Sequence, residues 1–140
     1  MKIGFIGLGN VGGKLASSLL RNKFELIVRD LDKNLTNKFL IKGAKIAKTN
    51  KELAEKADLI ITCLPSPKVC AEVMEAEDGV INGLSKNKIW LEMSTTDESE
   101  IKRLGKLVEE KSAVPLDGPV SGGCHRAATG NIAIFPVAAL

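Results

Sequence analysis

Three glycines near the start of the chain have a spacing that suits the binding of a nucleotide phosphate. Gly7, Gly9 and Gly12 form the pattern G-x-G-x-x-G directly after the apolar segment 3–6. In a strand-turn-helix unit, the first glycine permits a tight turn, the second lets the backbone approach a pyrophosphate, and the third lets the helix pack closely on the strand. The N–H groups at the start of the helix then face the phosphates. The pattern favours a dinucleotide site over the alternative, a strand-to-helix corner that is only structural.

An acidic residue follows at the distance expected for the same kind of site. Asp30 lies 21 residues after Gly9 and ends a second apolar run. The carboxylate of such a residue accepts hydrogen bonds from ribose hydroxyls and repels a 2′-phosphate, so Asp30 favours NAD over NADP. Arg29 and Lys33 flank it, and a nearby cation can accommodate a 2′-phosphate. NADP therefore stays open as the alternative cofactor.

Elements that could position these residues alternate along the whole chain. Apolar runs predict strands close to residues 3–6, 24–28, 44–47, 59–64, 88–93 and 113–116, with helical segments between them. This alternation is typical of a parallel α/β sheet covered by helices. We predict an α/β fold with a doubly wound, mainly parallel sheet in a single domain, residues 1–140.

Polar residues mark the starts of three of the predicted helices. The pair Thr49 and Glu52 has the spacing of a capping box. Ser66 is a candidate cap, because Pro67 then occupies the first helical position, where its missing N–H does no harm. The spacing from Thr95 to Glu98 predicts another capping box.

Several predicted strands end in residues that could contact a ligand, because open α/β sheets bind ligands beyond the carboxyl ends of their strands. Leu64 and Pro65 follow one strand and could make apolar contacts with a cofactor, or form an ordinary turn. Ser94 and Thr95 follow the next strand, where their hydroxyls could cap a helix, touch a ligand, or do both. The segment 117–123, Asp-Gly-Pro-Val-Ser-Gly-Gly, is predicted to be a loop that offers a hydroxyl and backbone N–H groups to a carboxylate, or a simple turn.

Composition narrows the class of protein. The net charge is +3 and the lysines are dispersed among acidic residues, without a basic block interleaved with aromatics, so we expect no nucleic-acid partner. No apolar run approaches the length of about 18 residues that spans a bilayer, and the chain opens directly into a strand. We therefore expect a cytoplasmic protein that does not enter a membrane.

The cysteines and the single histidine suggest no metal centre. Cys63, Cys70 and Cys124 lack the C-x-x-C spacing of a zinc site, and we expect reduced thiols. Cys63 lies in an apolar run and is predicted to be a core residue. The neighbours Cys124 and His125 leave open a nucleophile–base pair.

Taken together, these motifs resemble the 3-hydroxyisobutyrate dehydrogenase group of the β-hydroxyacid dehydrogenases, whose dinucleotide-binding domain is of the 6-phosphogluconate dehydrogenase type. The resemblance rests on the glycine-rich turn, the pair at 64–65, the pair at 94–95, and segment 117–123 with Gly130 and Asn131 beyond it. It extends from residue 2 to about residue 134 and implies a Rossmann domain that binds NAD or NADP. It also implies hydride transfer between that cofactor and a small 3-hydroxy acid.

The resemblance assigns roles to individual residues. It implies a pyrophosphate turn at residues 7–12, a ribose contact at Asp30, and a nicotinamide side that contains Leu64, Pro65 and Thr95. It implies that Ser121, Gly122 and Gly123 hold the substrate carboxylate. The residues of the implied pyrophosphate turn are Gly7, Leu8, Gly9, Asn10, Val11 and Gly12.

The chain also departs from the family pattern. Val11, Leu15 and Ser18 replace two methionines and an asparagine, and these changes leave the phosphate site credible. Segment 135–140 places Pro136 where the family continues a strand. Family members continue into an all-α domain for substrate binding and dimerisation, in which a lysine is the general acid/base, and no counterpart of that domain or lysine is expected here. The loss of a positioned acid/base typically costs about 10²–10⁴ in rate.

Two hypotheses follow. The first is that the chain is the cofactor-binding half of a 3-hydroxyacid dehydrogenase, weak or inactive alone, with no catalytic residue of its own. The second is a non-catalytic module that binds a nucleotide or a partner protein, motivated by the missing lysine and the apolar segment 135–140.

Overall fold

The apolar runs form the strands of one seven-stranded sheet in the computed structural model, which describes residues 1–134 and 136–138. The strands of this sheet are β1 (Lys2–Ile6), β2 (Glu25–Arg29), β3 (Lys45–Ile46), β4 (Leu59–Thr62), β5 (Ile89–Glu92), β6 (Val114–Asp117) and β9 (Val137–Ala138). Their order is β3-β2-β1-β4-β5-β6-β9, and all neighbours are parallel except β6 and β9. The predicted doubly wound, mainly parallel Rossmann sheet is therefore confirmed.

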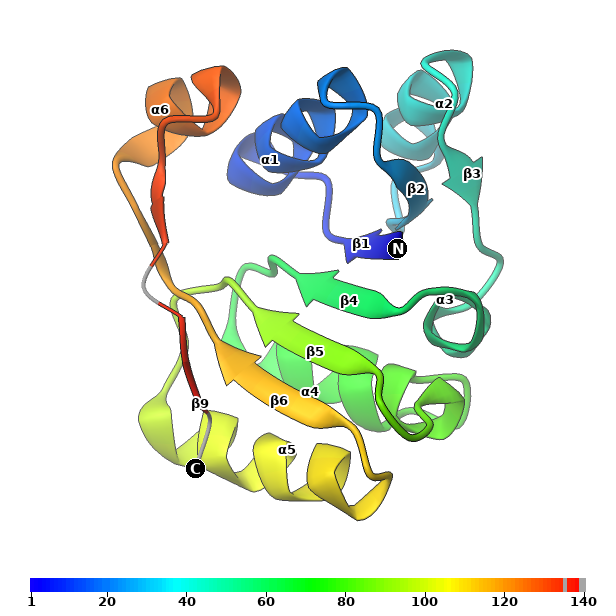
Figure 1. Cartoon of the computed structure of the whole chain (residues 1–140), viewed down its shortest axis with the longest axis vertical. Coiled ribbons are helices and arrows are strands. Elements are labelled where there is room, and N and C mark those ends of the chain that lie inside the picture. The colour runs from blue at the N-terminus through cyan, green and yellow to red at the C-terminus, as the bar shows by residue number, and fades with distance from the viewer. Residues whose placement is uncertain (135, 139–140) are drawn as a thin grey trace.

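Helices cover both faces of the sheet (Figure 1). They are α1 (Asn10–Arg21), α2 (Lys33–Ile41), α3 (Asn50–Lys56), α4 (Pro67–Glu75), α5 (Glu98–Glu110) and α6 (Gly123–Thr129), with a short 3-10 helix, η1 (Val80–Gly83). The buried side chains of α1, α2 and α6 belong to one apolar cluster, and those of α3, α4 and α5 belong to the other. Because the central strands are buried from both sides, they read as nearly continuous apolar runs.

Neighbouring side chains on β4 show how the two clusters share the sheet. Ile60 packs with Trp90 in the cluster under α4 and α5, whereas Ile61 belongs to the cluster under α1 and α2. Ile60 and Trp90 are fully buried. Side chains alternate between the two faces of a strand, so two adjacent isoleucines pack β4 against the helix layers on both faces of the sheet.

The strand register brings several loops to one edge of the sheet. Ile6 pairs with Arg29 on one side and Thr62 on the other, and Thr62 pairs with Glu92. The chain moves outward from β1 to β3 and then crosses back to β4, beside β1, so the direction of winding reverses between β1 and β4. Ligands of open α/β sheets bind outside the carboxyl ends at this kind of reversal. Gly7, Asp30, Cys63 and Met93 directly follow these ends.

The predicted caps are confirmed at two helices and wrong at a third. The Thr49 and Ser66 hydroxyls accept hydrogen bonds from the N–H groups of Glu52 and Val69. Thr95 does not cap α5, because the helix begins at Glu98 and the Asp97 side chain accepts from Ser99. Residues 94–97 instead extend the connection between β5 and α5.

The region after β6 differs most from the expectation. Segment 117–123 is not simply a loop, since its residues 120–121 form β7 (Val120–Ser121), which pairs antiparallel with β8 (Ala133–Ile134). The α6 helix between them, the η1 turn and β9 were not predicted. Strands of two residues carry too little alternation to be read from a sequence. Of the apolar segment 135–140, residues 135, 139 and 140 lie outside the described residues.

The described part of the chain contains no helix of the length and apolar character needed to cross a bilayer.

Candidate functional site

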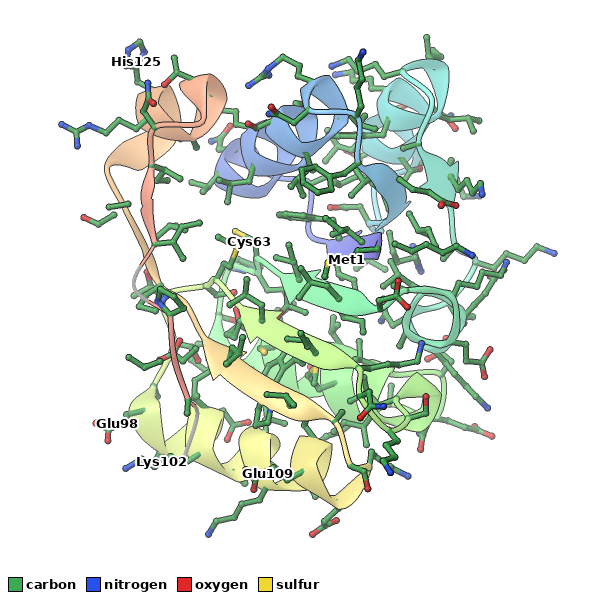
Figure 2. All side chains as sticks on the ribbon, in the orientation of Figure 1. Met1, Cys63, Glu98, Lys102, Glu109 and His125 are labelled. Carbon is green, nitrogen blue, oxygen red and sulfur yellow. The ribbon has the colours of Figure 1, made fainter. Side chains whose placement is uncertain are left out.

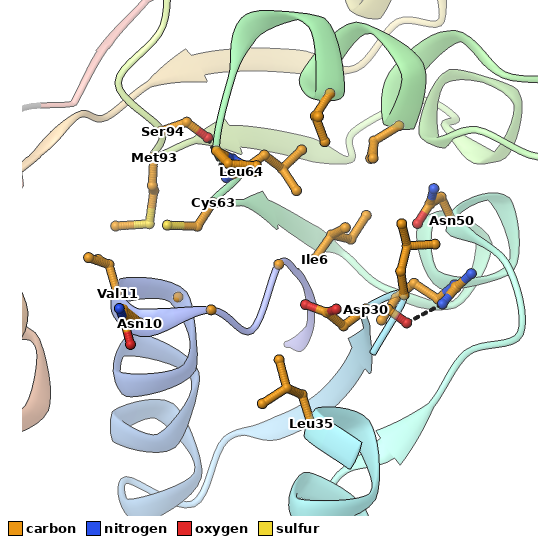
Figure 3. A pocket seen from close by; sticks show the side chains of 18 of the residues that line it. Ile6, Asn10, Val11, Asp30, Leu35, Asn50, Cys63, Leu64, Met93 and Ser94 are labelled. Carbon is orange, nitrogen blue, oxygen red and sulfur yellow. Dashed lines mark hydrogen bonds between the residues drawn. The ribbon is translucent and has the colours of Figure 1, made fainter. Parts of the chain in front are cut away.

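A cavity of about 820 Å³ opens at the carboxyl ends of β1, β2, β4 and β5 (Figure 3). Nine of the ten residues predicted to contact a cofactor line it. These nine are Gly7, Gly9, Asn10, Val11, Gly12, Asp30, Leu64, Pro65 and Thr95. The structure thus brings together residues from four separate strand ends, as expected for a binding site at the reversal of the sheet.

Two of the three glycines of the turn, Gly7 and Gly12, are required by close contacts with the backbone. Gly7 has a φ of +95°, and a Cβ there would lie 2.2 Å from the Cys63 carbonyl oxygen. A Cβ on Gly12 would lie 2.0 Å from the carbonyl oxygen of Gly7, so only glycine lets α1 approach the turn. A Cβ on Gly9, which lines the cavity, would meet no atom of the described residues within 4 Å. The turn therefore leaves open space for a ligand beside Gly9.

The start of α1 is left without a side-chain cap. Gly9 occupies the cap position and supplies no side-chain oxygen, whereas α2, α3, α4 and α5 are each capped by a side chain. Asn10, Val11 and Gly12 form the first turn of α1 and line the cavity. Uncapped N–H groups at the positive end of a helix dipole bind phosphate well.

Backbone N–H groups hold the Asp30 carboxylate in place at one end of the cavity. Its Oδ2 accepts from the Leu8 N–H at 2.7 Å, and its Oδ1 accepts from the Asp32 N–H at 2.8 Å. Each carboxylate oxygen can accept a further hydrogen bond. Leu8, the tenth predicted residue, does not line the cavity, because its side chain is buried in the core and its N–H orients Asp30.

Arg29 places a cation beside Asp30. Its Nη1 donates to the Asp30 carbonyl oxygen, and its Nε is buried with no hydrogen-bond partner among the described residues. Because Arg29 also lines the cavity, it places a positive charge at the same end of the cavity as Asp30. Lys33, the other cation considered from the sequence, begins α2 and does not line the cavity.

The opposite wall of the cavity is formed by the residues that follow β4 and β5. The Leu64 N–H donates to the Ser94 Oγ at 2.6 Å, and this bond joins the two connections. Figure 3 shows the Leu64 and Ser94 side chains next to each other on this wall. Ser94 is buried, and its own N–H donates to the Glu92 carboxylate at 2.6 Å. Sequence reasoning missed Glu92, which looks like an ordinary polar residue at the end of a strand.

Cys63 lies between the two walls. The prediction of a core residue is only partly right, because Cys63 is half-buried and lines the cavity, where its side chain lies close to Met93 (Figure 3). Burial, together with the charge of Glu92, raises the pKa of the Cys63 thiol to about 11. The thiol is therefore protonated at neutral pH and is a poor nucleophile.

The three residues predicted to hold a substrate carboxylate lie outside the cavity lining, next to it in the chain. Val120 lines the cavity, whereas Ser121, Gly122 and Gly123 follow it on β7 and at the start of α6. All three are exposed. Gly122 and Gly123 have φ values of 128° and 70°, which favour glycine over other residues. These two glycines allow the backbone to change direction sharply between β7 and α6.

The alternative pair Cys124 and His125 is not assembled into a site. Both residues lie in the short α6 helix, and His125 is exposed to solvent at its surface (Figure 2). Adjacent residues of a helix do not face each other, so the imidazole is poorly placed to take a proton from the thiol.

The sequence matches the family described as the NAD-binding domain of 6-phosphogluconate dehydrogenase over residues 2–139. The mitochondrial 3-hydroxyisobutyrate dehydrogenase of Mus musculus is 40% identical over 130 residues, which are 93% of this chain and 39% of the mouse protein.

Two solved structures show the same arrangement of elements. The 3-hydroxyisobutyrate dehydrogenase of Salmonella typhimurium has a TM-score of 0.89 and 25% identity, over 97% of this chain and 47% of that one. The Mycobacterium tuberculosis 3-hydroxyisobutyrate dehydrogenase with L-serine has a TM-score of 0.86 and 25% identity, over 96% of this chain and 45% of that one. The chain thus spans less than half the length of these relatives.

Proposed function

Because the chain belongs to the family of the NAD-binding domain of 6-phosphogluconate dehydrogenase, we propose that its cavity binds NAD in preference to NADP. The observation that carries this proposal is the uncapped start of α1, which faces a cavity with the Asp30 carboxylate at one end. The residues present fit a dinucleotide, since the space beside Gly9 suits a pyrophosphate and Asp30 suits a ribose diol.

Each part of the cavity then has one role. The N–H groups of residues 10–12 bind the pyrophosphate, with Gly7 and Gly12 keeping the turn close to the helix. Asp30 accepts hydrogen bonds from the adenosine ribose. Leu64, Pro65 and Thr95 contact the nicotinamide half, because they follow β4 and β5, on the far side of the turn from β2. When bound, NAD supplies a site that accepts or donates a hydride.

The preference for NAD rests on the fixed position of the Asp30 carboxylate. A 2′-phosphate at this ribose would approach a negative charge that two backbone N–H groups prevent from moving away. The positive charge of Arg29, which lines the cavity, offsets part of this repulsion. We therefore expect NADP to bind, but more weakly than NAD.

Isothermal titration of the 140-residue chain with NAD and with NADP tests this preference. The wild type should bind NAD at least about tenfold more tightly, which corresponds to about 1.4 kcal/mol. Asp30→Ala should weaken NAD binding and reduce or reverse the preference, and Arg29→Ala should weaken NADP binding more than NAD binding. Equal affinities of the wild type for both cofactors, unchanged in Asp30→Ala, would refute the assigned role of Asp30.

We further propose that the complete reaction is hydride transfer between this cofactor and a small 3-hydroxy acid. The family relatives named 3-hydroxyisobutyrate dehydrogenase support the reaction class, and Ser121, Gly122 and Gly123 are the proposed contacts for the substrate carboxylate. No lysine lines the cavity among the described residues. The 140 residues alone should therefore bind the cofactor with weak or no turnover.

A turnover assay with 3-hydroxyisobutyrate and NAD, monitored by absorbance of the reduced cofactor, tests the second proposal. The expected rate is at least about 10²-fold below that of an ordinary dehydrogenase, as for the loss of a general acid/base. A rate within tenfold of such an enzyme would show that the chain carries an acid/base of its own.

The cytoplasmic location stays a prediction, and the mouse relative is named as a mitochondrial protein.

A further inference from the structure

One carboxylate is completely buried in the sheet next to the proposed cofactor site. Glu92 is 0% exposed, and no cation within the described residues forms a salt bridge with it. A buried carboxylate is unfavourable unless hydrogen bonds satisfy it. Three donors do so here: the Thr62 hydroxyl and the Cys70 thiol reach Oε2 at 2.8 Å each, and the Ser94 N–H reaches Oε1 at 2.6 Å.

A further donor explains the direction of the hydrogen bond from Thr62. The Trp90 Nε1–H donates to the Thr62 Oγ1 at 2.9 Å, so the Thr62 hydroxyl proton is free to point at Glu92. The three hydrogen-bond partners of Glu92 among the described residues are donors, and they use acceptors at both of its oxygens. An ionised carboxylate provides acceptors at both ends, whereas an amide provides one acceptor end and one donor end.

The same network reaches the wall of the cavity in two steps. Glu92 holds the Ser94 backbone, and the Ser94 Oγ then accepts from the Leu64 N–H at 2.6 Å. Cys70 lies on α4, the helix that begins directly after Pro65 and Ser66. Glu92 therefore ties together β4, α4 and the connection after β5, which are the three segments that shape this wall.

We propose that Glu92 is a positioning residue that sets the wall on which the nicotinamide half of the dinucleotide lies. The proposal rests on the proposed function. The strand order places Asp30 after β2, the glycine turn after β1, and this wall after β4 and β5. A ligand whose adenosine ribose lies at Asp30 and whose pyrophosphate lies at the turn must place its nicotinamide half against Leu64 and Thr95. Glu92 touches no ligand and acts through Ser94 and Leu64.

The experiment compares NAD with ADP-ribose, which lacks only the nicotinamide ring, in Glu92→Gln. The Kd of NAD should rise about tenfold, the equivalent of one hydrogen bond of about 1.4 kcal/mol, while the Kd of ADP-ribose should stay within about twofold. A purely structural role of Glu92 would weaken both ligands equally and leave the ratio of their Kd values unchanged, and that result would overturn the proposal.

Two further variants keep the test decisive. Val108→Ala removes buried apolar atoms from α5, away from the cavity lining, so it should lower stability without changing the ratio. Ser94→Ala leaves the three donors to Glu92 in place and removes only the acceptor for the Leu64 N–H. If Glu92→Gln does not fold, an unchanged ratio in Ser94→Ala overturns the proposal.

The outcome for the wild type separates this inference from the function on which it rests. If the wild type binds neither NAD nor ADP-ribose, the proposed function fails and this inference fails with it. If the wild type binds both and the variants leave the ratio unchanged, only the role of Glu92 is refuted.

Discussion

One wall of the cavity is formed by backbone groups, and the other is held in place by side-chain hydrogen bonds. The wall after β1 consists of backbone, where Gly7, Gly9 and Gly12 let peptide groups approach each other and leave N–H groups exposed. The wall after β4 and β5 is held by side chains that converge on the buried Glu92. The shape of the first wall depends on the absence of Cβ atoms. The shape of the second wall depends on hydrogen bonds between buried donors and acceptors.

This difference determines how each wall should respond to substitution. A glycine turn fails by steric overlap, which is local and severe. A hydrogen-bond network fails when a buried donor or acceptor is left unsatisfied, which costs about 1–3 kcal/mol per group.

The largest effect should come from the glycine turn and should separate binding from stability. Gly12→Ala places a Cβ against the Gly7 carbonyl oxygen and should lower both, with an overpacking cost of about 1–3 kcal/mol or more. The methyl group of Gly9→Ala meets no atom in the described part of the chain, so this variant should keep the stability of the wild type and bind NAD about a hundredfold more weakly. Denaturant unfolding and titration calorimetry measure the two effects.

The pair of glycine variants also provides its own control. If Gly9→Ala bound NAD as tightly as the wild type, the space beside Gly9 would not be the position of the pyrophosphate. If Gly12→Ala were as stable as the wild type, the close approach of α1 to the turn would not limit the residue at this position.

The second prediction breaks the network on the opposite wall. Thr62→Val keeps the shape of the side chain but leaves the Trp90 Nε1–H without its acceptor and Glu92 without one donor. The free energy of unfolding should fall by about 1–3 kcal/mol. Thr36→Val is the matched control: Thr36 is buried, but its hydroxyl donates only to the Lys33 carbonyl in its own helix, and the loss should stay below about 1 kcal/mol. Equal losses in the two variants would contradict a special role for the network.

A contact could be predicted from the sequence when its residues lie close together along the chain, and this separates the two walls. The three glycines lie within six residues, so their spacing alone predicts the turn. The caps at Thr49 and Ser66 could be predicted for the same reason, because each depends on residues close together in the sequence. Glu92 contacts residues 22 and 30 positions away, and no local pattern marks such a contact. Thr95 illustrates another limit: it has the spacing of a capping box, but the nearby Asp97 is the residue that caps α5. The strands could be predicted from local patterns, although β4 ends two residues earlier than expected. The hydrogen bonds between the segments that follow the strands could not, because they depend on the fold.

The smallest expected effect is on the pH dependence of the reactivity of Cys63, which lies between the two walls. Its pKa of about 11 means that alkylation by iodoacetamide should keep rising with pH through pH 9–10, since only the thiolate reacts. Burial is the main cause and the Glu92 charge a lesser one, so Glu92→Gln should move the profile to lower pH by less than the shift that burial produces. Peptide mass spectrometry of the labelled chain distinguishes Cys63 from Cys70 and Cys124. An unchanged profile would place the Glu92 charge too far away to act on the thiol.

The two short strands at the borders of the sheet have a consequence for solution behaviour. β3 has two residues, and the Lys45 side chain on it pairs with Glu25 at 2.8 Å. At the other border, the four residues of β6 are partly covered by β9, which also has two residues and pairs antiparallel at Leu116 and Asp117. Long unpaired borders invite other chains to add a strand, and short or charged ones discourage it. Val114, on β6, is 47% exposed, so this border is where we expect self-association to begin when the protein is concentrated.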